Sequence, residues 1–364
     1  MTLVHLLVPA LAVLCTISLS AQSPVATPMT IVLPTDNDAL LRNDGPAFYM
    51  FVDRNFENVK STPWEGGQYG FVRGPIRFGA GVIQMHFHEG IDIAPIHRDA
   101  SGNPTDEVRS IARGEVVHAS TNSAASNYGR YVVVRHDWGQ GPFCSLYAHL
   151  STLKALPGQR VEAGSVLGIM GYTGSGIDRR RAHVHVELNL FLSSRFHDWH
   201  SKNFRPSPNQ HGIWNGLNLV GLNVAEFLLA AQKNPAFNAS EFVKNTDASW
   251  KVVLPRKGTL ELLTNYPWLG EQVESASPSW EITLADSGLP ISIKPSALAV
   301  TKPTVTWVND RSLPHLYHTR GYVSGNGNSG TLTASGVRFV ELLSGDFQAP
   351  ATAPPSPKAT KRKR

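Results

Sequence analysis

The chain has 364 residues, 41% of them hydrophobic and 17% charged, which excludes a disordered or fibrous protein and indicates an ordinary folded one. This length exceeds one average domain, so two folded units with additional ends are expected. The 31 glycines and 25 prolines imply many turns and favour a β-rich fold over long helices. The net charge of +5 equals the five Lys and Arg residues among the last seven positions, so the remainder is nearly neutral and no specific nucleic-acid partner is expected.

The amino terminus resembles a secretory leader. Residues 3–19 are mostly apolar and are followed by small residues at 18–21, a pattern typical of a signal peptide with its cleavage site. No Lys or Arg precedes the apolar run, which leaves an uncleaved anchor as the alternative. We therefore expect a signal peptide at 1–20, no transmembrane span after its removal, and export across the inner membrane to the periplasm, the cell envelope or the medium.

Cysteine usage excludes a disulfide framework. Once the leader is removed, Cys15 is lost and Cys144 is the only thiol, so no internal disulfide can form. Cys144 lies in an apolar run at 143–147, which predicts a buried core thiol rather than a nucleophile.

The remaining chain divides by its local patterns. Residues 21–45 are polar and read as a linker that contains a possible short strand at 30–33. A domain is expected at 46–192, where β-branched and aromatic runs at 130–135, 143–150 and 183–190 predict strands. A loop is expected at 194–212 and one helix at 223–233, which Asn234-Pro235 would stop.

The C-terminal region, 193–345, is expected to be β-rich and of unknown function. Further strands are predicted at 251–254, 280–284, 305–308 and 338–342. Residues 346–364 read as a disordered basic tail, which can attract anionic envelope polymer weakly and without specificity. Its alternative is a solubilising end.

Metal-competent side chains gather in three short segments. They are His88-Glu89-Gly90-Ile91-Asp92, Tyr147-Ala148-His149-Leu150 and His183-Val184-His185-Val186-Glu187. Any one of the 14 histidines is more often a surface or hydrogen-bonded residue than a ligand. Their joint occurrence indicates a site.

The third segment has the spacing of a strand. With a side-chain period of two, His183, His185 and Glu187 point to one face, where imidazoles lose hydration unless they are paired or bind a metal. His88 and Asp92 are four residues apart, but Gly90 and the β-branched neighbours favour an extended or turning segment over a helix. Two imidazoles and one carboxylate are a ligand set that leaves a fourth zinc position open for water.

These segments resemble the lysostaphin-like zinc endopeptidases, which hydrolyse peptide cross-links in peptidoglycan. The resemblance covers about residues 80–190, and the family pattern of His-x-x-x-Asp, Tyr-x-His and His-x-His is met in order by the three segments. It implies an antiparallel β-sheet peptidase domain. In this chain we expect that domain to be followed by the β-rich C-terminal region with one helix. It also implies export and a peptidoglycan peptide substrate.

The resemblance implies roles for five residues. His88, Asp92 and His185 would bind one zinc ion per chain, while His149 and His183 would act on the metal-activated water and the scissile carbonyl. A neutral imidazole can take the proton of the water, and a second can stabilise the oxyanion or protonate the leaving amine. The residues alone do not assign these two tasks.

Two features depart from the family pattern. The segment 97–107 is longer than the usual family turn, so one rim of the groove is expected to be reshaped. Residues beyond 192 lie outside the resemblance, and we expect them to position the substrate or to gate the groove.

Four other interpretations compete with this one. A helical His-Glu-x-x-His site would need a histidine where Asp92 stands, and 90–95 makes a poor helix. A structural zinc site usually has four ligands and is rich in cysteine. A non-catalytic peptidoglycan-binding activator of another hydrolase is the main alternative, although all five positions are filled. His86 is another possible ligand, and the histidines read as structural or surface residues are His97, His118 and His136.

Overall fold

The computed structural model describes residues 29–205, 207–270 and 276–347. The signal peptide expected at 1–20 and nearly all of the tail expected at 346–364 lie outside this part of the chain. Within it, no helix combines the length and apolar character needed to cross a bilayer.

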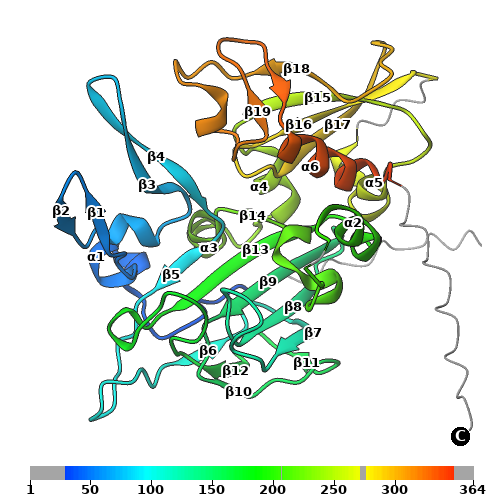
Figure 1. The fold of residues 1–364 in the computed structure, drawn as a ribbon. Helices are drawn as coiled ribbons and strands as arrows, with labels where there is room; N and C mark the ends of the chain where they lie inside the picture. Colours follow the sequence, from blue (N-terminus) through cyan, green and yellow to red (C-terminus); the bar gives the residue numbers. More distant parts are fainter. Residues whose placement is uncertain (1–28, 206, 271–275, 348–364) are drawn as a thin grey trace, which may run out of the picture.

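A seven-stranded antiparallel sheet carries the candidate site (Figure 1). Its order is β11-β7-β8-β9-β13-β14, and β5 pairs with β13 along the same edge as β14. The strands are β5 (Ile91–Ile93), β7 (Gly114–Ser120), β8 (Tyr131–Asp137), β9 (Pro142–Ala148), β11 (Arg160–Val161), β13 (Val184–Phe191) and β14 (Leu219–Leu222). Every residue of β13 is buried, so both faces of this central strand are covered. The mainly β class and the strands predicted at 130–135, 143–150 and 183–190 are confirmed.

The amino-terminal half of the described chain also forms shorter sheets. One is three-stranded, in the order β10-β12-β6, and two are the hairpins β1-β2 and β3-β4. Their strands are β1 (Arg54–Phe56), β2 (Val59–Ser61), β3 (Gly70–Phe78), β4 (Gly81–His88), β6 (Glu107–Arg109), β10 (Thr152–Leu153) and β12 (Val166–Ile169). Short helical turns complete this part: η1 (Ala39–Arg42), α1 (Gly45–Phe48), η2 (Trp64–Gly67) and η3 (Arg179–Arg181).

The strand predicted at 30–33 is wrong. These residues have no strand assignment, although the Val32 amide donates to the Ile111 carbonyl at 2.9 Å. Ile31 is buried and belongs to the main hydrophobic core. The apolar run therefore reflects packing of the chain onto the domain rather than sheet pairing.

The C-terminal region has its own four-stranded antiparallel sheet, in the order β17-β16-β15-β18. Its strands are β15 (Trp250–Pro255), β16 (Ser279–Leu284), β17 (Pro290–Ser296) and β18 (Thr304–Val308), with a small hairpin of β19 (Val323–Ser324) and β20 (Thr331–Leu332). The α-helices are α2 (Phe196–Asn203), α3 (Val224–Lys233), α4 (Ala239–Lys244), α5 (Glu261–Asn265) and α6 (Ala334–Ser344). The turns are η4 (Gly212–Trp214), η5 (Gly216–Asn218), η6 (Pro267–Leu269) and η7 (His315–Tyr317).

The helix predicted at 223–233 is confirmed as α3, and the Asn223 side chain accepts from the Glu226 amide as its cap. The region holds further helices that the sequence analysis missed. The strand predicted at 338–342 is wrong, because it lies in α6, where Thr333 caps the start and Gly345 ends the helix at φ 65°. The loop predicted at 194–212 contains α2. At 338–342 the strand-favouring Phe339 and Val340 suggest a strand, and at 194–212 the polar residues suggest a loop. Only the longer 3.6-residue period shows the helices.

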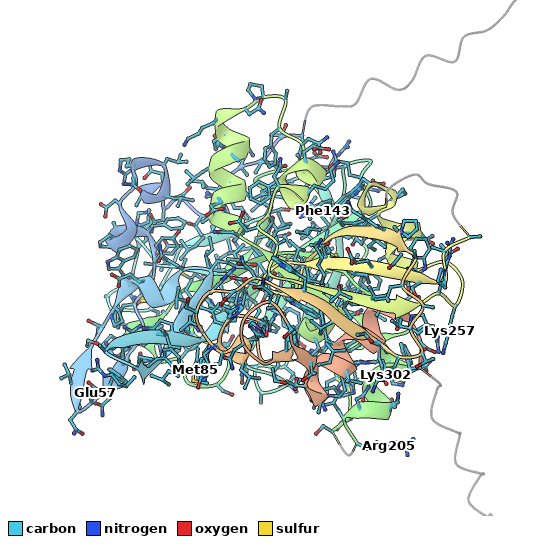
Figure 2. The ribbon with its side chains drawn as sticks, turned by 90° about the horizontal axis from the view of Figure 1, so that it is seen from above. Glu57, Met85, Phe143, Arg205, Lys257 and Lys302 are labelled. Carbon is cyan, nitrogen blue, oxygen red and sulfur yellow. The ribbon has the colours of Figure 1, made fainter. Side chains whose placement is uncertain are left out.

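The two regions share one core. Tyr266 accepts from the Phe191 amide at 2.8 Å and donates to the Pro142 carbonyl at 2.7 Å. Phe143 is fully buried and stacks on Trp268 with an interplanar angle of 9°. Figure 2 shows Phe143 within the body of the molecule, whereas Glu57 lies at the outer end of the β1-β2 hairpin. Cys144 is buried and free, as predicted.

Gly90 allows the close approach of the β4-β5 turn to β13. A Cβ atom at Gly90 would lie 2.3 Å from the Val186 carbonyl oxygen, a distance that real Cβ atoms do not adopt. We expect Gly90→Ala to destabilise the protein by about 1–3 kcal/mol through overpacking, and to weaken metal binding because His88 and Asp92 flank this turn. Thermal unfolding and metal titration would measure both effects.

Gly81→Ala is the matched control, because a Cβ there meets only the Phe78 carbonyl oxygen at 3.8 Å. Equal melting temperatures for the two variants would contradict this account of the turn.

Candidate metal centre and its groove

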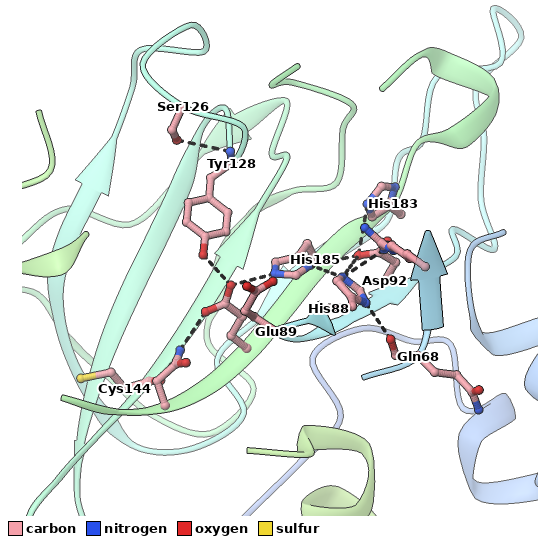
Figure 3. Close-up of polar contacts among 12 residues, drawn as sticks. Gln68, His88, Glu89, Asp92, Ser126, Tyr128, Cys144, His183 and His185 are labelled. Atoms are coloured by element: carbon pink, nitrogen blue, oxygen red, sulfur yellow. Dashed lines mark hydrogen bonds and ion pairs between the residues drawn. The ribbon is translucent and has the colours of Figure 1, made fainter. Parts of the chain in front are cut away.

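Three polar side chains meet where β4, β5 and β13 come together. His88 is the last residue of β4, Asp92 is the middle of β5, and His185 is the second residue of β13. The register pairs Asp92 directly with His185. The two-residue turn between β4 and β5 brings His88 beside them. All three side chains are buried, with exposures of 3%, 2% and 6%. Figure 3 shows them grouped together.

The facing atoms of these residues form a triangle. His88 Nε2 lies 3.2 Å from Asp92 Oδ1, His185 Nδ1 lies 2.9 Å from the same oxygen, and the two nitrogens are 3.0 Å apart. Ligand atoms at two corners of a tetrahedral zinc site lie roughly 3.3 Å apart when metal bonds are about 2.0–2.1 Å. The triangle therefore fits one face of such a site. Among the described residues, this is the only group of three or more His, Cys, Asp and Glu that could hold an ion.

Hydrogen bonds on the far side of each imidazole fix its tautomer. His88 Nδ1 contacts the Gln68 carbonyl at 2.7 Å, and His185 Nε2 contacts a Glu187 carboxylate oxygen at 2.8 Å. These oxygens can only accept, so each of those nitrogens carries the proton. The ring nitrogens that face Asp92 are then His88 Nε2 and His185 Nδ1, and these are the atoms that would bind a metal.

Glu187 is itself held in place by its neighbours. Tyr128 donates to Glu187 Oε1 at 2.6 Å, and Asn189 donates to Oε2 at 3.0 Å. Burial opposes a charge on His185, but hydrogen bonds to Asp92 and Glu187 raise its pKa to about 9. The pocket around His185 thus favours positive charge, as a cation site must. The period-two argument placed Glu187 on this face, and the structure shows that it orients His185.

The two remaining predicted histidines stand beside the triangle. Their ring centroids are 4.8 Å apart, and His183 Nε2 lies 3.4 Å from Asp92 Oδ1. His149 Nδ1 donates to the Thr173 carbonyl at 2.9 Å and His183 Nδ1 to the Arg181 carbonyl at 2.6 Å. In the neutral form of each ring, Nε2 is therefore the acceptor.

His149 has an unusual backbone and an unusual charge environment. It is a non-glycine residue at φ 65°, a conformation seen mainly where surrounding structure enforces it, often at functional sites. Burial holds the pKa of His149 well below its usual range, and the nearby His183 and His185 lower it further. The His149 side chain is accordingly neutral at physiological pH.

One further residue of the site lies outside the sequence motifs. Arg73, on β3, donates from Nη2 to Asp92 Oδ2 at 2.5 Å and lies 3.1 Å from His88 Nε2. Its Nε donates to the Gly66 carbonyl at 2.8 Å. Arg73 precedes the recognised segment by fifteen residues, so no motif spacing identified it.

A groove of about 750 Å³ opens over the triangle. Residues beyond 195 form part of its wall, and among them are Gln210, His211, Asn215, Leu217 and Arg320. The Arg320 guanidinium donates a hydrogen bond to the carboxylate of Glu89, the residue after His88. None of the described lining residues comes from 97–107, so reshaping of a rim by that segment stays a prediction.

The other histidines considered earlier take no part in the triangle. His86 is exposed on β4. His136 is buried between the Arg113 carbonyl and the Ser145 hydroxyl, which indicates a structural role.

Residues 86–195 match the sequence model of the family described as peptidase family M23. Solved structures similar to this chain include the catalytic domain of the prophage-encoded M23 protein EnpA from Enterococcus faecalis, with 24% identity over 38% of this chain and 79% of that one and a TM-score of 0.25. The lysostaphin catalytic domain from Staphylococcus simulans has 24% identity over 34% and 82% of the two chains and a TM-score of 0.24. A zinc containing peptidase from Vibrio cholerae has 24% identity over 39% and 36%, with a TM-score of 0.25.

The matched segment contains His88, Asp92, His149, His183 and His185. It also agrees with the span of about 80–190 expected from the sequence. The chain therefore contains an M23 metallopeptidase domain, at residues 86–195, with its His-Asp-His metal site intact.

Proposed function

We propose that this protein is an exported, zinc-dependent endopeptidase that hydrolyses peptide bonds in the stem peptides or cross-bridges of peptidoglycan. The observation that carries the proposal is the buried triangle of His88, Asp92 and His185 below an open groove that also holds two imidazoles. The family match and the resemblance to lysostaphin-like endopeptidases support peptidoglycan as the substrate, and the leader expected at 1–20 agrees with it.

His88 Nε2, Asp92 Oδ1 and His185 Nδ1 would hold one zinc ion. Two neutral nitrogens and one carboxylate leave the ion a net positive charge, and zinc in such a site supplies Lewis acidity for hydrolysis. The identity of the metal is part of the proposal, because other divalent ions also accept imidazole and carboxylate ligands.

His149 and His183 would move protons during hydrolysis. Each has its Nδ1 proton committed to a backbone carbonyl, which orients the ring and leaves Nε2 toward the site. One Nε2 can accept a proton from the attacking water, and a protonated Nε2 can hydrogen-bond the developing oxyanion or donate to the leaving amine. Burial keeps the pKa of His149 low, which favours the neutral form that a general base needs.

The alternative is a non-catalytic domain that binds peptidoglycan and activates another hydrolase. A domain of that kind does not need oriented acceptors beside a metal site. Here all three ligands and both flanking imidazoles are present, buried and hydrogen-bonded on their far sides, which favours catalysis.

The first test is digestion of purified peptidoglycan by the protein, with and without a chelator. We expect new amino termini in stem peptides or cross-bridges, identified by mass spectrometry, and we expect the chelator to abolish them and added zinc to restore them. Release of sugars alone would indicate a glycosidase instead. No release by fully metal-loaded protein would favour the binding module.

The second test separates catalysis from metal binding. We expect His149→Ala and His183→Ala each to lower kcat by about 10²–10⁴-fold, the usual contribution of general acid–base catalysis, while zinc content stays near one ion per chain. His86→Ala is the control, since His86 is exposed and lies outside the triangle. Normal turnover in either of the first two variants would remove that residue from the mechanism.

The third test concerns the carboxylate behind His185. We expect Glu187→Gln to weaken zinc binding by about 10–100-fold, because the amide group cannot accept hydrogen bonds from His185, Tyr128 and Asn189 together. Competition with a chromophoric chelator measures the affinity. Glu115→Gln, which changes an exposed ion pair with Arg135, should leave it unchanged, and equal affinities for the two variants would refute the role of Glu187.

A further inference from the structure

The two oxygens of Asp92 have different partners. Oδ1 faces His88 Nε2 and His185 Nδ1 at 3.2 and 2.9 Å, whereas Oδ2 accepts from Arg73 Nη2 at 2.5 Å. We infer that Arg73 is a positioning residue that keeps Asp92 a one-oxygen metal ligand, so that the metal retains an open position for the reaction.

The chemistry of carboxylates gives this contact its importance. A carboxylate can bind a metal through one oxygen or through both. If Asp92 turned so that both oxygens reached the metal, it would fill the position that a catalytic site must keep open. The Arg73 hydrogen bond is charge-assisted, and such bonds are the strong ones. Two-oxygen binding would have to compete with this bond at Oδ2.

Arg73 is held at its other end as well. Nε donates to the Gly66 carbonyl at 2.8 Å, and Nη2 also lies 3.1 Å from His88 Nε2, so the guanidinium is held between a backbone acceptor, Asp92 and His88. The ion pair joins a side chain that is 32% exposed to one that is 3% exposed. Arg73 can therefore act on Asp92 without being buried itself.

The β3-β4 hairpin is shaped to deliver this side chain. Its ladder pairs Phe71 with Phe87 and then Arg73 with His86, a shift that gives β3 one extra residue. Such a bulge turns the local strand and re-aims the side chain beside it. Gly74 follows at φ 64°, and a Cβ there would lie 2.5 Å from the His86 ring. The bulge and Gly74 thus lie beside Arg73, where the side chain must turn toward Asp92.

A second arginine on β3, Arg77, does not contact Asp92 and has other partners. It lies four residues further along the strand, forms an exposed pair with Glu57 and stacks on Phe56 at 5.8 Å. Arg77 therefore serves as the matched control for Arg73.

The test compares Arg73→Gln, Arg73→Lys and Arg77→Gln with the wild-type protein, each loaded with cobalt(II) in place of zinc. Four-coordinate cobalt(II) absorbs visible light more strongly than five-coordinate cobalt(II). We expect Arg73→Gln to lose intensity in these bands and to lose about 10–100-fold in kcat/KM on peptidoglycan. Arg73→Lys should recover part of both, and Arg77→Gln should match the wild type.

An unchanged cobalt spectrum in Arg73→Gln would overturn the inference. If that variant does not fold, a structure of the zinc-loaded wild-type protein decides: Asp92 must bind through one oxygen with Arg73 on the other, and two-oxygen binding would refute the role. This inference rests on the metal site of the proposed function. The spectrum and the structure need no substrate, so a wild type that fails to cleave peptidoglycan would refute the function separately.

Discussion

The pairing of β5 with β13 is the interaction on which the site depends. It places Asp92 directly opposite His185. Because Gly90 has no side chain, the turn between β4 and β5 can approach β13 and bring His88 to the same point. Buried imidazoles and carboxylates lose hydration and must recover that free energy from each other or from an ion. Here each group has a partner on its far side and a ligand atom toward the centre, so the strand register that positions the ligands also keeps their polar groups paired.

The site could be predicted largely from the sequence because its residues lie in short segments with regular spacing. A side-chain period of two places His183, His185 and Glu187 on one face, and the structure brings the ligand atoms of His88, Asp92 and His185 within 4.8 Å of one another. The partners that orient these groups could not be predicted in the same way. The Gln68 carbonyl is a backbone group that carries no residue signature, and Arg73 reaches Asp92 only through a bulge in a hairpin.

The C-terminal region was predicted less well for a related reason. The strands at 251–254, 280–284 and 305–308 correspond to β15, β16 and β18. They could be predicted because strands are locally rich in β-branched and aromatic residues. The sequence predicts a strand within α6 because its five-residue window contains the strand-favouring residues Phe339 and Val340. The helical period appears only over the eleven residues between the cap at Thr333 and Gly345. The contact of Arg320 with Glu89 joins residues 231 positions apart, beyond any local pattern.

The family match ends at residue 195, yet the sheet does not. Strand β14 (Leu219–Leu222) closes the edge of β13 beyond its pairing with β5, so a fragment cut at the family boundary would expose unpaired amides beside apolar side chains. Such an edge invites aggregation. A graft of this unit into a chimaeric enzyme needs the chain through at least Leu222, and Tyr266 and Trp268 complete its core. The modular unit of this protein is therefore larger than its recognisable motif.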